Sequence, residues 1–344
     1  MRILVTGNRG YIGCVLVPML REGGHKVVGF DTGYYDDSSL PPVPEPDVQI
    51  KKDIRDAAAA DFENIDAVIH LAALSNDPLG ELVPGLTEAI NRDASIRLGD
   101  LARAAGVERF VYASSQSMYG VADPNTEIEE ATGSAEHAIT AYARTKWEAE
   151  VALKKLGNDN FAVVCMRPST VFGASARLRS DIVFNNLVGC AYTTGRVEIK
   201  SDGSPWRPVV HIKDVCAAFI AGLETPRELV AGESFNVGLP NGNFTVRDLA
   251  EAAERSVPGA TLRFTGEHKD NRSYRVSFSK ILSVLKDYYK PEWGLDRGGR
   301  ELVEFFKKIN FTEEVFRGRD TVRLRQISHL KESGKLGDDL RWKP

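Results

Sequence analysis

An apolar run that breaks into three evenly spaced glycines constrains the fold of this chain more than any other feature. Residues 3–13 read ILVTGNRGYIG, and the chain then continues as an apolar segment to Leu20. This order is typical of a buried strand, a tight turn and the start of a helix. Gly7 would permit the turn, Gly10 would let backbone N–H groups approach a pyrophosphate, and Gly13 would let helix and strand pack closely. The stretch predicts a dinucleotide-binding loop.

A second apolar run, VVGFD at residues 27–31, ends in an acid that supports this interpretation. The spacing G-x-x-G-x-x-G differs from the commoner G-x-G-x-x-G, and three glycines alone are weak evidence. Asp31, however, follows Gly13 by 18 residues, close to the ~20 at which an acid holds the ribose 2′-hydroxyl. Because a carboxylate would repel a 2′-phosphate, the sequence favours NAD over NADP as the cofactor.

Composition excludes several classes of partner. The 344 residues are 42% hydrophobic and 27% charged, and the net charge of −4 provides no general attraction for nucleic acid or an anionic membrane. The longest apolar run, near 215–223, is too short to span a bilayer, and the glycine loop starts six residues after Met1, so we expect a cytoplasmic protein. The four cysteines form no C-x-x-C pair, so we predict reduced cysteines and no metal site.

The first half of the chain alternates between two kinds of segment. Apolar runs of strand length around Asp53 and Ile54, at 67–73 and at 110–115 alternate with helical spans such as 92–105. This alternation predicts an α/β fold with a doubly wound parallel sheet, a Rossmann domain. The segment 34–47 holds four prolines, which exclude regular structure and predict a surface flap near the adenosine end.

The second half returns to the same pattern after an interruption. Residues 161–166 read as a buried strand, and 209–223 and 234–238 read as core helix and strand, whereas a helix at 246–256 and a strand at 261–265 belong to a smaller mixed region. We therefore predict two lobes that exchange segments. An NAD-binding domain comprises 1–173 plus 209–238, and a smaller lobe of mixed α/β structure, which would bind the substrate, comprises 174–208 plus 239–344.

Three side chains form the candidate catalytic group. Tyr142 and Lys146 share one face of a helix, and Ser115 at the end of a neighbouring strand can reach the same place. Tyrosine becomes an effective base only when its pKa of ~10 falls towards 7. A nearby cation supplies roughly 1 to 3 units of that change, and the positive nicotinamide supplies more. Alone, Y-x-x-x-K is an ordinary start of an amphipathic helix; together with the glycine loop and Asp31 it indicates catalysis.

These motifs resemble the extended short-chain dehydrogenase/reductase family, the NAD-dependent sugar-nucleotide epimerases and dehydratases. The matching segments are TGNRGYIG at 6–13, HLAA at 70–73, SSQSMYG at 114–120, YARTK at 142–146 and RPSTVFG at 167–173. In that family the Tyr takes a proton from a sugar hydroxyl, usually at C4, the Ser hydrogen-bonds the same oxygen, and the Lys holds the nicotinamide ribose. The resemblance implies cofactor contacts at Gly7, Gly10, Tyr11, Ile12, Asp31, Asp53, Ile54, Leu71, Ala72, Ala73, Tyr142, Lys146 and Pro168.

The resemblance also implies contacts with a nucleoside-diphosphate sugar. Asn186, Arg207 and Arg272 resemble family positions that touch the nucleotide or its diphosphate, and guanidinium suits phosphate through paired donors. Ser115, Gln116 and Ser117 would face the sugar. Arginines are usually solvated, which is the competing interpretation of Arg177, Arg179 and Arg275, and His211 is read as structural.

Gln116 and Ser117 bear on the reaction type. Dehydratases of the family carry an Asp-Glu pair at these positions, and neither Gln nor Ser titrates near pH 7. We therefore expect an epimerase. A 4-dehydrogenase remains an alternative, as does a 4,6-dehydratase that uses Glu136 or His137 instead. A non-catalytic dinucleotide sensor is a further alternative, which the presence of both Tyr142 and Lys146 disfavours. The sequence does not identify the nucleotide base, the sugar or the reacting carbon.

Two helices predict a homodimer. The helix at 142–156 carries two apolar stripes, one of which can meet the sheet while the other remains for a second surface. The helix at 92–105 also presents apolar residues at helical spacing. Two such helices from each subunit would form a four-helix contact, as the family resemblance also implies.

Overall fold

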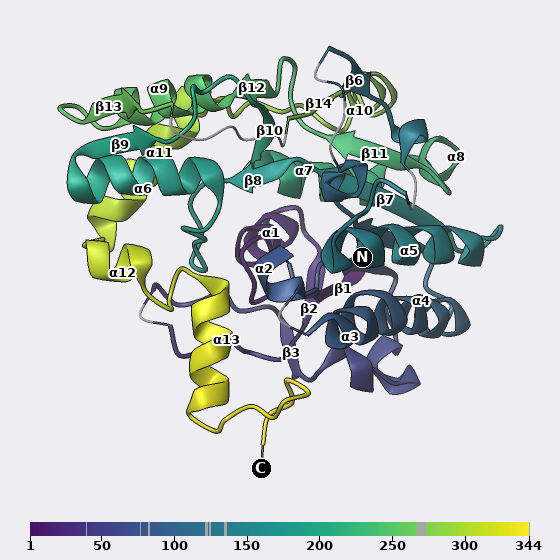
Figure 1. Ribbon diagram of the computed structural model, residues 1–344. Helices are drawn as coiled ribbons and strands as arrows, with labels where there is room; N and C mark the ends of the chain where they lie inside the picture. The colour runs from purple at the N-terminus through teal and green to yellow at the C-terminus, as the bar shows by residue number, and fades with distance from the viewer. Residues whose placement is uncertain are drawn as a thin grey trace.

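The computed structural model describes residues 1–38, 40–75, 77–81, 83–120, 123, 125–133, 136–266 and 273–343. A parallel sheet forms its centre (Figure 1), and within the described residues this sheet has seven strands in the order β11-β7-β5-β4-β1-β2-β3. The strands are β1 (Arg2–Thr6), β2 (Lys26–Asp31), β3 (Val48–Lys51), β4 (Ala67–His70), β5 (Arg109–Ala113), β7 (Ala162–Pro168) and β11 (Ser234–Val237). The predicted doubly wound α/β fold is confirmed.

Helices cover both faces of the sheet because successive side chains of each strand point to opposite sides. On β1, Ile3 and Val5 join one apolar core with α1 (Gly13–Glu22) and α7 (Ile212–Glu224). Leu4 joins the other core, with α4 (Ala94–Ala104) and α5 (Ala141–Leu156). Burial on both faces explains why these strands read as continuous apolar runs.

Two sequence expectations about strands were wrong. Asp53 and Ile54 do not lie in a strand: the edge strand β3 ends at Lys51, and Ile54–Asp56 forms a 3-10 turn. The Asp53 carboxylate accepts a hydrogen bond from the backbone N–H of Arg55 at 2.8 Å, which caps that turn. The run at 209–223 is not one helix, since its first three residues complete strand β10 before α7 begins.

A smaller mixed region lies beyond the carboxyl ends of the central strands (Figure 1). Its sheets pair β8 (Thr170–Phe172), β10 (Trp206–His211) and β12 (Asn243–Thr245), then β9 (Arg196–Ile199) with β13 (Thr261–Phe264), and β6 (Glu127–Ile128) with β14 (Arg275–Val276). A third apolar core joins α6 (Val183–Thr194), α9 (Val246–Ser256) and α11 (Leu295–Lys308). Shorter helices are α2 (Asp77–Gly80), α3 (Pro84–Thr87), α8 (Arg227–Val230), α10 (Ser279–Val284) and α12 (Glu313–Arg317), and a π-helical stretch, Glu88–Asp93, leads into α4.

The proline-rich segment 34–47 has no helix or strand among its described residues, as predicted. It is more than a surface flap, because Leu40 and Val43 are buried and Arg177 donates a hydrogen bond to the carbonyl oxygen of Pro41 at 3.2 Å. Leu40 packs in the core of the smaller mixed region, and with the Arg177 hydrogen bond it fixes this segment against the rest of the protein.

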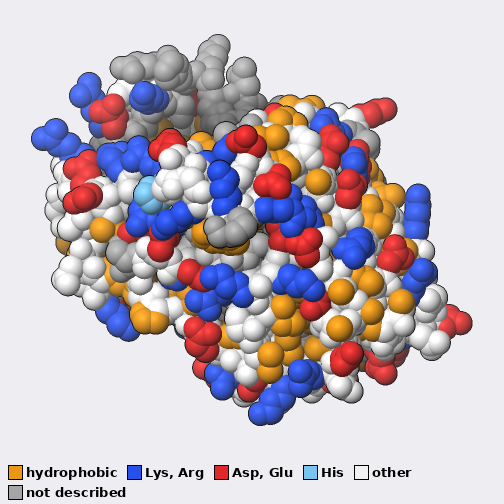
Figure 2. Space-filling model, turned by 90° about the horizontal axis from the view of Figure 1, so that it is seen from below, with side chains coloured by type: hydrophobic (Ala, Val, Ile, Leu, Met, Phe, Trp, Pro, Cys, Tyr) orange, Lys and Arg blue, Asp and Glu red, His pale blue; other side chains and the backbone are white. Residues whose placement is uncertain are grey.

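The C-terminal helix α13 (Arg323–Glu332) and the tail after it return to the dinucleotide domain (Figure 1). Ile327 and Leu340 join the core beneath β2, and the indole N–H of Trp342 donates to the carbonyl oxygen of Thr32 at 2.8 Å. The proposed boundaries of the two lobes stay a prediction. No helix within the described ranges has the length and apolar character needed to cross a membrane. On the face seen in Figure 2, basic and acidic side chains are intermixed.

Candidate active site

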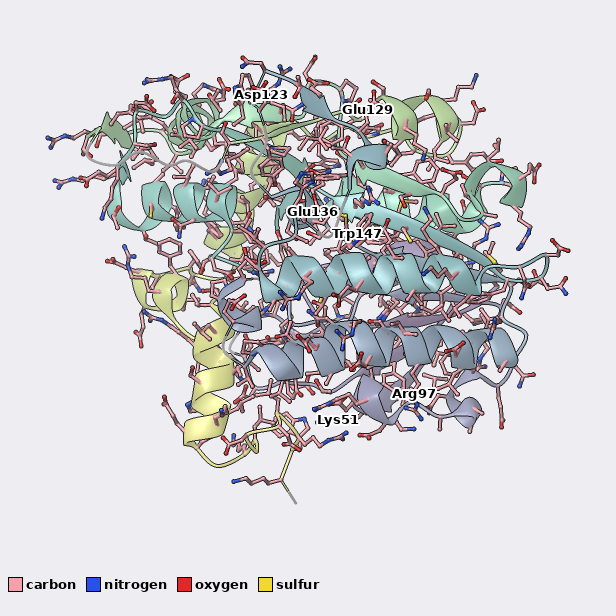
Figure 3. The ribbon with its side chains drawn as sticks, turned by 45° about the vertical axis from the view of Figure 1, so that its right-hand side comes forward. Lys51, Arg97, Asp123, Glu129, Glu136 and Trp147 are labelled. Carbon is pink, nitrogen blue, oxygen red and sulfur yellow. The ribbon has the colours of Figure 1, made fainter. Side chains whose placement is uncertain are left out.

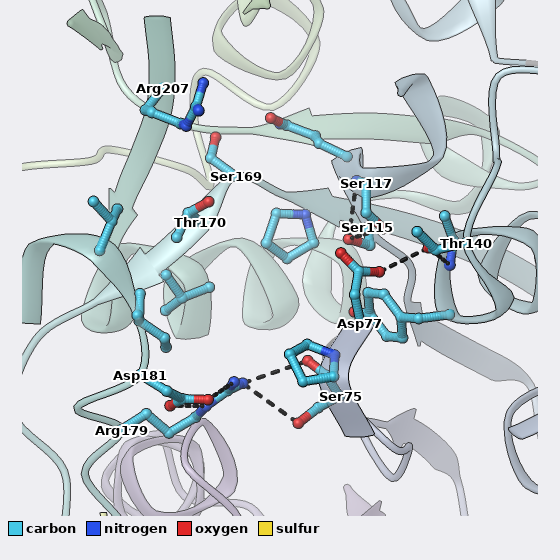
Figure 4. Close-up of a pocket in the computed structure, with 18 of the residues that line it drawn as sticks. Ser75, Asp77, Ser115, Ser117, Thr140, Ser169, Thr170, Arg179, Asp181 and Arg207 are labelled. Carbon is cyan, nitrogen blue, oxygen red and sulfur yellow. Dashed lines mark hydrogen bonds and ion pairs between the residues drawn. The ribbon is translucent and has the colours of Figure 1, made fainter. Parts of the chain in front are cut away.

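A cavity of about 940 Å³ opens at the carboxyl ends of the central strands, where it meets the smaller mixed region. This is the place at which open α/β sheets bind their ligands. One side of the cavity is formed by the segment after β4, the end of β5 and the start of α5, and the other by strands β8 and β10 and helix α6 (Figure 4).

The three candidate catalytic residues all line this cavity. Thr140 caps the N-terminus of α5 by accepting a hydrogen bond from Ala143 N at 3.1 Å, so the helix presents Tyr142 and Lys146 on one face, one turn apart. Ser115 follows β5, and its hydroxyl oxygen accepts from the Ser117 hydroxyl at 2.9 Å. Ser115 is also hydrogen-bonded to Tyr142. The group predicted from the sequence thus converges.

Burial controls the titration of both helix residues. It raises the pKa of Tyr142, while the hydrogen bond with Ser115 and the charge of Arg179 act in the opposite direction. Burial lowers the pKa of Lys146 to about 7, against a smaller effect of Glu150. Lys146 Nζ donates to the carbonyl oxygen of Ala113 at 2.7 Å. The protein groups around Tyr142 therefore do not by themselves bring its pKa towards 7.

The glycine loop fits a dinucleotide pyrophosphate. Gly7 has φ +71°, and a Cβ there would lie 2.9 Å from the backbone nitrogen of Ala72. A Cβ at Gly13 would lie 2.4 Å from the Gly7 carbonyl oxygen, so helix and strand pack as closely as predicted. A Cβ at Gly10 would meet only that same oxygen, at 3.1 Å, among described atoms within 4 Å. The outer side of the loop is therefore open beside the N-terminus of α1.

Asp31 lies at the carboxyl end of β2, next to this loop. Its carboxylate accepts hydrogen bonds from the backbone N–H groups of Gly33 at 2.8 Å and Arg9 at 3.1 Å. Burial raises the pKa of Asp31, and these two hydrogen bonds act against that rise. A carboxylate fixed in this way suits the paired hydroxyls of an adenosine ribose.

The predicted cofactor contacts divide into two groups. Those that line the cavity are Tyr11, Ile12, Leu71, Ala73, Tyr142, Lys146 and Pro168. The others, which belong to the turn and strand ends outside it, are Gly7, Gly10, Asp31, Asp53, Ile54 and Ala72. Asp53 forms an ion pair with Arg55 at 2.7 Å, and Ile54 is buried in the core.

Five of the six predicted sugar-nucleotide contacts line the cavity: Ser115, Gln116, Ser117, Asn186 and Arg207. Gln116 is 1% exposed and donates to the carbonyl oxygen of Arg167 at 3.0 Å, while its side-chain oxygen has no hydrogen-bond partner within the described residues. Asn186 donates to the carbonyl oxygen of Ser180 at 2.9 Å. Arg272 lies outside the described residues.

Other residues of the cavity wall were not predicted from the sequence. Ser75 and Asp77 follow β4, and Arg179 and Asp181 precede α6. Arg179, for which a solvated surface position was the competing interpretation, is 9% exposed and pairs with Asp181 at 2.7 Å. The rule that polar residues after the carboxyl ends of parallel strands face the ligand could have found Ser75 and Asp77.

Arg275 and His211 do not line the cavity among the described residues, and both have partners within the protein. Arg275 pairs with Glu127 at 2.6 Å and lies over the Trp206 ring. His211 is fully buried. Its Nε2 lies 2.8 Å from a carboxylate oxygen of Glu301, and its ring stacks on the indole of Trp293. Within the described residues, His, Cys, Asp and Glu side chains do not gather in a group that could hold a metal ion.

The doubly wound sheet, the glycine loop and the Ser-Tyr-Lys group at the carboxyl edge of the sheet define a dinucleotide-dependent enzyme of the short-chain dehydrogenase/reductase class. Residues 3–238 match the model of the NAD dependent epimerase/dehydratase family, and the chain belongs to that family.

Similar proteins span several activities within this class. A UDP-glucose 4-epimerase of Mycolicibacterium smegmatis is 29% identical over 320 residues, which cover 89% of this chain and 99% of the relative. The solved structure of MoeE5 in complex with UDP-glucose and NAD has a TM-score of 0.74 and 27% identity, and the match covers 90% of this chain and 99% of that one. A 3 beta-hydroxysteroid dehydrogenase/Delta 5-->4-isomerase of Mycobacterium tuberculosis is 30% identical over 61% of this chain and 58% of its own length. NAD is the cofactor of the family to which this chain belongs.

Proposed function

We propose that this protein is an NAD-dependent sugar-nucleotide epimerase that acts through a transient keto-sugar at C4. The observation that carries the proposal is the joint position of Tyr142 and Ser115 in the cavity wall beside two side chains that cannot act as an acid–base pair, Gln116 and Ser117. Full-length similarity to a UDP-glucose 4-epimerase and to a structure that binds UDP-glucose supports a nucleoside-diphosphate sugar as the substrate.

The proposed mechanism gives each residue a task. Tyr142, as the phenolate, accepts the proton of the C4 hydroxyl at Oη and returns it when the ketone is reduced, and Ser115 hydrogen-bonds the same sugar oxygen. Bound NAD supplies the hydride acceptor and, once reduced, the hydride donor at C4. Lys146 holds the nicotinamide ribose, while Arg207 and Asn186 bind the diphosphate. Between the two hydride transfers, the keto-sugar rotates within the cavity so that its opposite face meets the hydride donor.

The dehydratase alternative needs another acid–base pair. Glu136 and His137 are exposed on the loop before α5, and neither is among the described residues that line the cavity (Glu136 is labelled in Figure 3). Gln116 donates its amide to a backbone carbonyl, and neither Gln116 nor Ser117 has a side chain that titrates near pH 7. This arrangement favours epimerisation over elimination of water. A 4-dehydrogenase would use the same residues as an epimerase and differ only in releasing the ketone.

Mass balance tests the proposal. The purified protein is incubated with UDP-, dTDP-, GDP- and CDP-hexoses, and the products are analysed by mass spectrometry and NADH absorbance. An epimerase gives a product of unchanged mass without accumulating NADH. A product lighter by one water would establish the dehydratase alternative, and one NADH per keto-sugar the 4-dehydrogenase. Bound NAD with no turnover of any sugar nucleotide would indicate the sensor alternative.

We also propose a homodimer built on α4 and α5, which lie side by side on one face of the molecule (Figure 3). Leu101 and Leu156 are only partly buried there and are available for a second subunit. Trp147, from one of the two apolar stripes of α5, packs within its own chain, since a Cβ at Gly133 would lie 2.6 Å from its ring. A monomer in light scattering at micromolar concentration would contradict the dimer.

A further inference from the structure

Asp77 places a carboxylate at the reactive end of the cavity. It begins α2, directly after the segment that follows β4, and lines the cavity together with Ser115 and Tyr142. The hydroxyl of Thr140 donates to Oδ1 of Asp77 at 2.7 Å. Figure 4 shows this hydrogen bond, with the other carboxylate oxygen on the side of Ser115. Oδ2 is therefore the oxygen placed to meet a ligand.

The position of Asp77 is fixed relative to the candidate base. A Cβ on Gly80, at the end of α2, would lie 3.1 Å from Cβ of Tyr142, so α2 packs directly on the start of α5. Glu81 accepts a hydrogen bond from the backbone N–H of Ala141 at 2.8 Å. Together with the Thr140 contact, this bond ties α2 to the N-terminus of α5. These contacts between α2 and the start of α5 hold Asp77 in a fixed position relative to Tyr142.

The two ends of the cavity differ in charge. At the end near Tyr142, Lys146 donates to a backbone carbonyl, Arg179 pairs with Asp181, and the carboxylate of Asp77 also lines the cavity. The wall provided by β10 and the end of β9 carries two cations, Arg207 and Lys200, and one carboxylate, Glu198. This polarity matches a substrate with its anionic diphosphate at one end and an uncharged sugar at the other.

We propose, on the basis of the function proposed above, that Asp77 is a specificity-determining residue that selects a neutral hexose and rejects a hexuronate. Its Oδ2 accepts a hydrogen bond from a hydroxyl of the sugar. C6 is attached to the ring carbon next to C4, so a C6 carboxylate is carried close to Asp77 in at least one of the two sugar orientations that epimerisation requires. Two carboxylates held close together at this half-buried position repel each other.

The test measures binding in a complex that does not turn over. Tyr142→Phe is loaded with NAD, and calorimetry compares a nucleoside-diphosphate glucose with the corresponding glucuronate, using the nucleotide that binds best among UDP, dTDP, GDP and CDP. We expect the glucose compound to bind at least about tenfold more tightly, since juxtaposed like charges are strongly unfavourable. Adding Asp77→Asn, which keeps an acceptor for Thr140, narrows the gap to within a few-fold through tighter binding of the glucuronate.

Glu81→Gln is the matched control. The Glu81 carboxylate also belongs to the contact between α2 and α5, but Glu81 is not among the described residues that line the cavity. This variant should leave the affinity ratio unchanged. Equal affinities for the two sugars, or a ratio that Asp77→Asn does not alter, would overturn this inference while leaving the epimerase proposal intact. Binding of NAD and free nucleotide without either sugar nucleotide would overturn both.

Discussion

The carboxylate of Glu150 and the guanidinium of Arg167 form an ion pair that is buried behind the active-site strand β5. Nε of Arg167 lies 3.1 Å from each carboxylate oxygen. Ser114 donates to Oε2 at 2.5 Å and Ser234 to Oε1 at 2.7 Å, so the carboxylate joins α5 to residues of β7, β11 and the end of β5. Burial alone would raise the pKa of Glu150, but the interactions with Arg167 and the two serines outweigh it and lower that pKa.

Breaking this pair should destabilise the protein strongly. Glu150→Gln leaves a buried guanidinium without its counter-charge, and we expect a loss of about 3–5 kcal/mol in the free energy of unfolding. The double variant Glu150→Leu with Arg167→Met should lose less than the sum of the single variants, because no unpaired charge remains. Urea unfolding of Glu150→Gln, of the single variants Glu150→Leu and Arg167→Met, and of the double variant gives the comparison. A single variant within about 1 kcal/mol of the wild type, the range of an exposed pair, would contradict the expectation.

Tyr142→Phe should lose turnover by roughly 10² to 10⁴ while keeping the fold and bound NAD, because only the proton acceptor is removed. Tyr112→Phe is the matched control. The Tyr112 hydroxyl is buried and has no hydrogen-bond partner within the described residues, so its removal should leave turnover close to wild type. Steady-state kinetics and the stoichiometry of bound NAD measure both effects. Turnover of Tyr142→Phe within a few-fold of wild type would assign the base to another residue.

The close approach at the third glycine predicts a further pair of variants. Gly13→Ala would push a Cβ to 2.4 Å from the Gly7 carbonyl oxygen, so the backbone of the loop must shift. We expect lower thermal stability and weaker NAD binding. Gly85→Ala, at a helical glycine whose Cβ would meet no described atom within 4 Å, should be neutral or slightly stabilising. Equal melting temperatures and NAD affinities for the two variants would show that the loop tolerates the methyl group.

The sheet could be predicted where both of its faces are covered. β1, β4 and β5 are buried throughout or nearly so, and they appear in the sequence as unbroken apolar runs. The edge strand β3 has no fully buried residue and reads VQIK, so it gave no signal. Ile54, by contrast, is buried in a turn, and a single buried Ile in a turn cannot be told from one in a short strand.

The site could be predicted where residues follow strand ends or recur at helical spacing. Ser115, Tyr142 and Lys146 meet these conditions, and they converge. Arg179 could not be predicted, because its burial depends on Asp181 and on a distant segment that contributes Ser75. Local sequence does not reveal that a charged pair is enclosed by elements from elsewhere in the chain.

The Glu301 carboxylate should link stability to acid pH. Burial alone would raise its pKa, but His211 and Lys213 outweigh that effect and lower the pKa to about 2, from an ordinary 4.5. A lowered folded pKa contributes stability above the unfolded value, which is lost as the pH falls from about 4.5 towards 2. Glu301→Gln should therefore cost up to about 3 kcal/mol at pH 7 and progressively less below pH 4.5.

Denaturant unfolding between pH 3 and pH 7 tests this linkage. Glu304→Gln on the same helix changes an exposed carboxylate and should have little effect at any pH. A stability difference between wild type and Glu301→Gln that stays constant over this range would show that the carboxylate contributes through packing instead of charge.

The last prediction concerns cofactor choice and rests on Asp31 and the arginine beside it. Asp31 accepts a hydrogen bond from the backbone N–H of Arg9, whereas the Arg9 guanidinium forms ion pairs with Asp36 at 2.7 Å and Glu45 at 3.3 Å. The guanidinium of Arg9, the one cation in the glycine loop, is thus already paired, and the carboxylate of Asp31 lies beside the loop at the end of β2. We expect NAD to bind at least about tenfold more tightly than NADP, because a 2′-phosphate would be placed against a carboxylate.

Asp31→Asn should narrow this ratio of affinities, and further replacement of Asp36 and Glu45 by amides should narrow it more by releasing Arg9 for the phosphate. Asp47→Asn, which alters a carboxylate bonded to the opposite end of β2 through Val27 N, is the control and should leave the ratio unchanged. Calorimetric titration with both dinucleotides measures the ratio, and tighter binding of NADP by the wild-type protein would refute the role given to Asp31.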